Sequence, residues 1–162
     1  MGESEKFKYE YWRYDKHFVL KPPLALKISL VVLCKDLILS LLLGATNFKS
    51  RGSSLGSDAA DIVQPVFIIS ALPAAALFLA MVARGPDAGT LTRFVWRNGR
   101  ILITLSVLTY LALFLASFGF EIRNYSVTHG FMLLAYAIIL THCWRSILLK
   151  DVFLEFHDKG TK

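Results

Sequence analysis

The sequence predicts an all-α integral membrane protein, a four-helix bundle with both termini in the cytoplasm. Three observations lead to this prediction. Hydrophobic residues make up 55% of the 162 residues and charged residues only 19%, a balance far from that of an average soluble domain. The hydrophobic residues gather in runs of about 20 residues, the length that crosses a bilayer as a helix. Lysine and arginine residues lie mainly on one side of these runs, which sets the orientation.

The four predicted spans cover residues 24–44, 62–83, 101–120 and 127–149. Helices are the expected spanning element, because barrel strands would be half as long and would alternate apolar with polar residues. Together the spans form one domain over residues 22–149. Residues 1–21 precede it as a cytoplasmic segment rich in aromatic and basic side chains, and residues 150–162 follow it as a cytoplasmic tail.

The orientation follows from lysine and arginine alone. These residues are frequent in the N-terminal segment, in the loop between the second and third spans, and at the C-terminal end. The two remaining loops contain only Lys49, Arg51 and Arg123. The positive-inside rule therefore places both termini and the middle loop in the cytoplasm. The first span has no cleavable signal peptide before it, so we expect it to act as an uncleaved signal anchor.

The three tryptophans, Trp12, Trp96 and Trp144, all fall on the predicted cytoplasmic side. Tryptophan is enriched where the bilayer meets water, so we predict that these residues are anchors at the headgroup level. Trp12 belongs to an aromatic stretch, FKYEYWRY, which has two open interpretations. It could dock on a neighbouring protein, or it could serve as an interfacial anchor.

The first span contains two adjacent, opposite charges, Lys35 and Asp36, near its centre. Each costs roughly 2.5 to 3.5 kcal/mol there, enough to cancel the favourable insertion of the surrounding leucine, isoleucine and valine residues. Neighbouring residues on a helix point about 100° apart, so we expect that these two side chains do not pair with each other. Their stabilisation should then come from other helices, from another chain or from water.

Counting about 1.5 Å per residue along each span gives their predicted neighbours. Tyr110 and Tyr136 fall at a depth close to that of Asp36, and His142 lies somewhat nearer the cytoplasm. The predicted intramembrane polar layer consists of Lys35, Asp36, Tyr110, Tyr136 and His142. In one interpretation the layer is a proton or ion relay. In the other, which we favour because a four-span protein of this size can hardly enclose a solute pathway alone, the charges fix how helices or subunits pack.

Several classes of function are not indicated. No phosphate-binding loop and no serine nucleophile motif occurs, so we predict no enzyme activity. Cys34 and Cys143 fit no metal or redox spacing, and we predict neither a metal nor a cofactor. The formal net charge of +6 would suggest nucleic acid in a soluble protein. However, no basic patch with interleaved aromatics lies away from the spans, and nucleic acid is not expected as a partner.

Three features occur in a characteristic order: the stretch YDKHFVLKPPLALKISLVVLCKDLIL, a proline in the second span, and RFVWRNGRILI leading into the third. The residues concerned in the first stretch are Tyr14, Asp15, Leu20, Lys21, Pro22, Pro23, Leu24 and Lys35. Over roughly residues 14–149 the chain resembles a family of small four-span proteobacterial inner-membrane proteins catalogued as a domain of unknown function. The resemblance implies a bacterial inner membrane and the same topology, and it implies no catalytic residue.

These observations favour an accessory, assembly or stabilising subunit of a larger membrane protein complex. The expected partners are the lipid bilayer and other membrane-protein subunits or further copies of the chain. The alternative function is a small-solute or proton-coupled transporter, itself oligomeric, that uses Lys35 and Asp36. The variant Asp36→Asn separates the two, because a subunit would lose partner binding or stability whereas a transporter would stay folded and lose flux.

Overall fold

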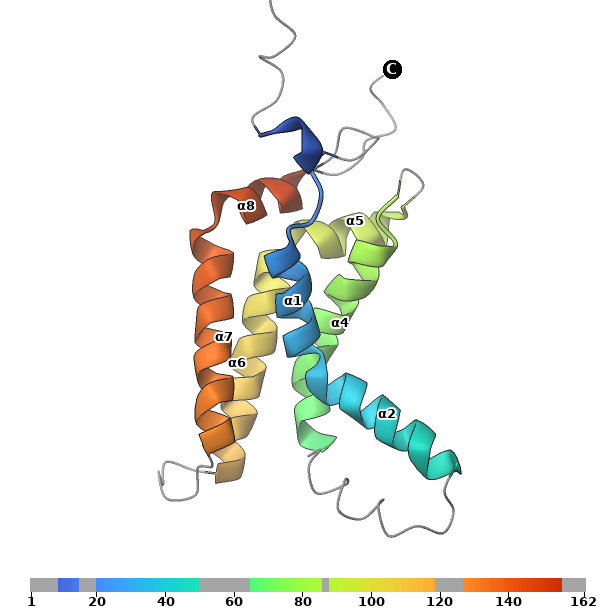
Figure 1. The fold of residues 1–162 in the computed structure, drawn as a ribbon, viewed down its shortest axis with the longest axis vertical. Coiled ribbons are helices and arrows are strands. Elements are labelled where there is room, and N and C mark those ends of the chain that lie inside the picture. The colour runs from blue at the N-terminus through green and yellow to red at the C-terminus, as the bar shows by residue number, and fades with distance from the viewer. Residues whose placement is uncertain (1–8, 15–19, 50–64, 86–87, 119–126, 156–162) are drawn as a thin grey trace, which may run out of the picture.

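The computed structural model describes residues 9–14, 20–49, 65–85, 88–118 and 127–155 (Figure 1). These ranges contain no β-strand, and their one isolated β-bridge joins Tyr14 to Leu20. In chain order the elements are the 3-10 turn η2 (Tyr11–Arg13), α1 (Leu24–Leu33), α2 (Lys35–Lys49), the 3-10 turn η3 (Pro65–Phe67), α4 (Ile68–Val82), α5 (Thr90–Arg97), α6 (Gly99–Phe118), α7 (Val127–Arg145) and α8 (Ile147–Leu154). The prediction of an all-α fold is confirmed.

Helices α1, α4, α6 and α7 form the bundle, and α5 and α8 lie across one end of it (Figure 1). Helix α4 is central, since it packs against α1, α2, α5 and α6, while α7 packs against α6. The face of α4 that meets its neighbours carries small buried residues, Ala71, Ala74 and Ala80. Small side chains let helix backbones approach closely. The contact with α6 is also polar, because the Ser106 hydroxyl donates to the Ser70 carbonyl.

The first predicted span is not one straight helix. It divides at Cys34, whose backbone (φ −87°, ψ 2°) departs from helical geometry, and α2 then runs away from the bundle (Figure 1). Backbone hydrogen bonds meet at Cys34 from both sides, from Cys34 N to Leu30 O (2.9 Å) and from Ile38 N to Cys34 O (2.9 Å). The chain therefore changes direction at Cys34, and the prediction of one helix over residues 24–44 was wrong.

The other boundaries agree with the predictions to different degrees. Helix α6 covers nearly the predicted third span. Helix α4 lies within the predicted second span, of which residues 62–64 fall outside the described ranges. The predicted fourth span ends early, because the chain turns by 70° between α7 and α8. Ser146 lies at this turn, and its hydroxyl accepts a hydrogen bond from Leu149 N (3.3 Å), which caps α8.

Two segments predicted as a loop and a polar tail contain helix. The middle loop includes α5, which buries Trp96 and exposes Leu91 and Phe94. The first residues of the tail belong to α8, where Val152 and Phe153 are buried. Both helices are short, and α5 is amphipathic. The tail from residue 156 onward lies outside the described residues.

The helices differ in whether they meet one test, that of being long and apolar enough to cross a membrane. Among the described residues, α6 passes this test by itself over Gly99–Ser117. Helices α7 and α8 pass it only when the bent pair is counted as one span. Helices α1 and α4 are apolar but shorter.

Helices α5 and α8 cover one end of the bundle, which we call the capped end. The buried Gly99 provides a test of the packing there. A Cβ atom at this position would overlap the Phe153 ring, lying 2.7 Å from its Cζ atom. We predict that Gly99→Ala lowers the free energy of unfolding by about 1–3 kcal/mol, as overpacking does, in unfolding of the purified protein followed by circular dichroism. The control is Gly130→Ala in α7, which has no atom within 4 Å of the new Cβ and should leave stability unchanged or slightly raised. Equal stability of the two variants would contradict the described docking of α8.

Candidate functional site

Lys35 and Asp36 lie where α2 begins, directly after the break at Cys34, and they pair with each other. The Lys35 Nζ atom is 2.7 Å from Asp36 Oδ1. The side chains are 23% and 11% exposed, respectively. The prediction that the two could not pair was therefore wrong. It assumed an uninterrupted helix, whereas the pair lies at a change of helix direction and the long lysine side chain folds back onto its neighbour.

Two tyrosines from other helices join the pair. Lys35 Nζ lies 5.6 Å from the centre of the Tyr110 ring of α6, within the range of a cation–π contact. The Tyr110 ring meets the Tyr136 ring of α7 edge to face, with centroids 4.4 Å apart at 81°. Asp36 is close enough to interact electrostatically with both phenols. The structure thus brings together four of the five residues predicted for the polar layer, and we call Lys35, Asp36, Tyr110 and Tyr136 the polar cluster.

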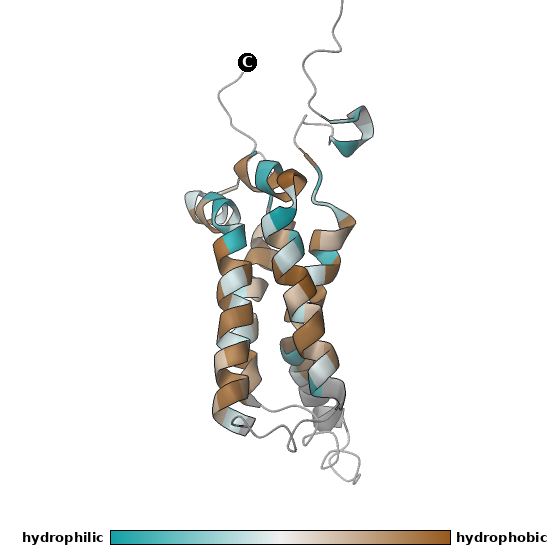
Figure 2. Cartoon of the chain, turned by 90° about the vertical axis from the view of Figure 1, so that its left-hand side faces the viewer, coloured by the Kyte–Doolittle hydropathy of each residue, from teal (hydrophilic) through white to brown (hydrophobic). Residues whose placement is uncertain are grey.

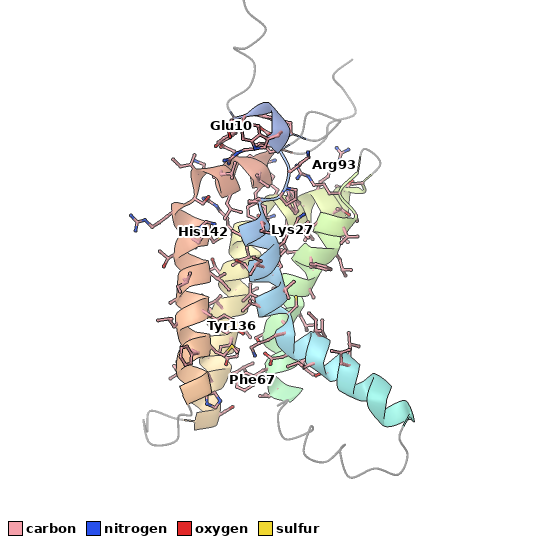
Figure 3. The ribbon with its side chains drawn as sticks, in the orientation of Figure 1. Glu10, Lys27, Phe67, Arg93, Tyr136 and His142 are labelled. Carbon is pink, nitrogen blue, oxygen red and sulfur yellow. The ribbon has the colours of Figure 1, made fainter. Side chains whose placement is uncertain are left out.

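Aromatic residues that the sequence analysis did not single out surround the polar cluster. The Phe67 ring of η3 is 5.0 Å from the Tyr110 ring, and Phe114 stacks near the same tyrosine at 6.3 Å. Figure 3 shows Phe67 and Tyr136 in the same half of the bundle, away from the end where Glu10 lies. Their apolar character gave no signal in the sequence, because many similar residues occupy the spans.

One oxygen of the polar cluster remains unsatisfied. The Asp36 Oδ2 atom is buried and has no hydrogen-bond partner among the described residues. A buried acceptor without a partner costs about 1–3 kcal/mol, and more when it is charged. The ion pair with Lys35 therefore carries most of the stabilisation of this carboxylate.

His142 does not join the polar cluster, contrary to the prediction. On α7 the buried side chains include Tyr136, Ile139 and Cys143, whereas His142 is exposed. The reason is angular, since adjacent residues on a helix point about 100° apart and Cys143 faces the interior. His142 lines an outward-facing shallow groove along α7 together with Leu134, Ala137, Ile138, Thr141 and Arg145.

The three predicted anchors differ in exposure. Trp12 is 67% exposed and Trp144 is 57% exposed, whereas Trp96 is fully buried. The Trp96 indole donates from Nε1 to the Val152 carbonyl (2.9 Å) and lies 5.2 Å from the Phe153 ring. Trp96 therefore joins α5 to α8, and its prediction as a headgroup anchor was wrong.

The N-terminal segment packs on the same end of its own chain. The Tyr9 hydroxyl donates to Asp151 of α8 (2.5 Å). Arg84 donates from Nη1 to the Leu20 carbonyl and from Nη2 to the Glu155 carbonyl, both at 2.9 Å. The Leu20 amide in turn donates to a Glu155 carboxylate oxygen (3.2 Å). Three segments distant in the sequence are thus joined at the capped end of the bundle.

Within the described ranges, no three histidine, cysteine, aspartate or glutamate side chains gather where they could hold a metal ion. A lysine–aspartate pair beside two phenols can fix the packing of three helices.

A comparison with known families identifies the chain. The family model described as "Protein of unknown function (DUF2919)" matches residues 9–155. The chain belongs to this family. The match includes every described residue, and with them the polar cluster and the capped end. Comparisons with curated proteins and with solved structures found no match, so the function has to be argued from the geometry.

Removing one member of the ion pair should destabilise the protein more than removing both. Lys35→Met leaves a buried carboxylate without its counter-charge, and breaking a buried pair in this way costs about 3–5 kcal/mol. Lys35→Met/Asp36→Leu removes both charges, a replacement that is often neutral. We predict that the double variant unfolds with a higher free energy than the single variant does. The control is Lys27→Met, which removes an exposed lysine of α1 and should change stability by less than about 0.5 kcal/mol. A double variant as unstable as the sum of its two singles would contradict the pairing.

Proposed function

We propose that this protein spans a bacterial inner membrane four times, with both termini in the cytoplasm, and serves as an accessory, assembly or stabilising subunit of a larger membrane complex. The proposal has three parts: insertion in the bilayer, orientation, and association with a partner. Each is supported by a different feature of the fold.

Insertion in the bilayer is supported by the outer surface of the bundle. Large apolar side chains point outward on every helix of the bundle, for example Ile28 on α1, Leu79 on α4, Leu108 on α6 and Ile138 on α7. A surface helix of a water-soluble protein would carry polar residues on this face. Figure 2 shows hydrophobic colouring along the helices and most of the hydrophilic colouring near the capped end. The 20 residues of α6 rise about 30 Å, the thickness of a hydrocarbon core.

The orientation is supported by the capped end. The segments joined there are the N-terminal segment, the loop containing α5, and α8, which include most of the basic residues. The positive-inside rule places this end in the cytoplasm. Helices α5 and α8 lie across the bundle (Figure 1) and expose Leu91, Phe94, Ile147 and Leu154. Short transverse helices with exposed apolar residues suit the membrane interface.

The subunit role is supported above all by α2. This helix leaves the bundle, and its side chains Ile38, Leu39, Leu41 and Leu42 are all exposed. The polar cluster at its start neutralises its charges within the chain, which agrees with a role in packing. Helix α2 therefore forms an apolar arm that a helix of a larger membrane protein could pack against.

A specific observation keeps the transporter as a second candidate. Asp36 Oδ2 has no hydrogen-bond partner among the described residues, and ionisable side chains buried within a membrane often lie on an ion or proton pathway. In a transporter, Asp36→Asn would abolish flux while the protein remained folded and assembled. In a subunit, the same variant would weaken assembly or stability.

The topology predicts a labelling pattern in intact cells. After Cys34 and Cys143 are replaced by alanine, Ser53→Cys should react with a membrane-impermeant maleimide applied from the periplasm. Arg97→Cys on α5 should react only after the membrane is permeabilised. The protein should also remain in the membrane during alkaline extraction. Release by alkali would contradict insertion, and the reverse labelling pattern would contradict the orientation.

The subunit role predicts a contact made through α2. A photo-reactive residue at Leu42 should cross-link to one larger membrane protein that also co-purifies in fixed stoichiometry. The same residue at Leu108, equally exposed but on α6, is the matched control and should not form that cross-link. A protein that purifies alone, with no cross-link from Leu42, would contradict the subunit role. Loss of flux in Asp36→Asn would then support the transporter.

A further inference from the structure

The capped end contains a pocket that the proposed function does not use. It lies between η2, the residues that lead into α1, and α8. Its lining consists of Trp12, Arg13, Lys21, Pro22, Pro23 and Leu148. We call it the cap pocket. It includes the Lys–Pro–Pro motif that precedes α1.

Backbone pairing holds two basic residues together in the cap pocket. The bridge between Tyr14 and Leu20 is extended by a hydrogen bond from Lys21 N to Arg13 O (2.7 Å). Both side chains line the cap pocket, and like charges held close together are destabilising. Among the described residues, the Glu10 carboxylate lies 3.6 Å from Arg13 Nε, and because both side chains are about half exposed this pair offsets the repulsion only in part. An anion between Arg13 and Lys21 would offset this repulsion.

The Lys21 ammonium is also held in place. Its Nζ atom donates to the Trp12 carbonyl (3.3 Å), which uses one of its three N–H donors. Beside it the lining is apolar, with the exposed Trp12 ring, two prolines and Leu148. The cap pocket therefore offers two cations next to a surface that suits an apolar group. An anionic amphiphile has this combination of properties.

We infer that the cap pocket binds the headgroup of an anionic phospholipid, with Arg13 and Lys21 on the phosphate and with Trp12 and Leu148 beside the glycerol and the upper acyl chain. The inference rests on the membrane orientation proposed above. Helix α1 begins at Leu24, immediately after the pocket, so the pocket lies at the level of the cytoplasmic headgroups. That leaflet carries anionic lipids, which attract basic residues.

Native mass spectrometry of the purified full-length chain in mild detergent tests the inference. Titrated with phosphatidylglycerol or phosphatidylcholine, the protein should retain phosphatidylglycerol preferentially. Arg13→Gln/Lys21→Gln should weaken this binding about tenfold or more, as expected for the loss of two such contacts. The matched control is Arg145→Gln/Lys150→Gln, which removes two exposed basic residues of the same end that do not line the pocket and should bind as the wild type does. Arg13→Lys/Lys21→Arg, which retains the charges, should also bind.

Equal retention of the two lipids would overturn the inference, and so would equally weakened phosphatidylglycerol binding in the Arg13/Lys21 and Arg145/Lys150 variants. Displacement of the lipid by millimolar inorganic phosphate would also overturn it, because that result would identify a site for free anions. The measurement is made in detergent and requires neither a partner protein nor an intact membrane. Loss of the lipid preference in a chain that resists alkaline extraction would therefore contradict the cap pocket alone. Release by alkali would contradict the proposed membrane insertion.

Discussion

The ion pair between Lys35 and Asp36 is the constraint on which the arrangement of the helices depends. Two charges in an apolar helix must be neutralised locally, because removal from water costs several kcal/mol for each ion. The chain achieves this by changing direction at Cys34, so that the lysine reaches its neighbour and lies over the Tyr110 ring. The same change of direction carries α2 out of the bundle. Local neutralisation of charge and exposure of an apolar arm are thus two consequences of one feature.

At the capped end, arginine and tryptophan side chains donate hydrogen bonds to backbone carbonyls. Arg84 donates to the carbonyls of Leu20 and Glu155, and Arg100 donates to the Ser146 carbonyl between α7 and α8. Trp96 donates to another carbonyl of α8. Basic residues that the positive-inside rule counts only as charges therefore also fasten the transverse helices to the bundle. Their hydrogen bonds hold together the end of the molecule that forms the cap pocket.

The sequence predicted those features that depend on local composition. The boundaries of α6 followed from its apolar length, and Tyr110 and Tyr136 were placed beside Asp36 by helical rise alone. Other features depend on tertiary contacts and left no comparable signal. Cys34 is not a helix breaker by propensity, so the break was missed. At the 70° turn after α7, the Ser146 carbonyl accepts a hydrogen bond from Arg100 of α6, a contact between segments distant in the sequence. Helical spacing could have found the outward direction of His142, since Tyr136 and Cys143 mark the buried face of α7.

The direction of α2 is the most direct test of this account, because the ion pair, the break and the apolar arm all determine it. Pulsed electron paramagnetic resonance can compare two pairs of spin labels, one joining Ile28 to Thr141 near the capped end and one joining Leu42 to Phe131 near the other end. The account predicts that the second distance exceeds the first by an amount on the order of 10 Å, since α2 rises about 1.5 Å per residue as it leaves the bundle. Equal distances would show one continuous first helix packed along the bundle and would contradict the account.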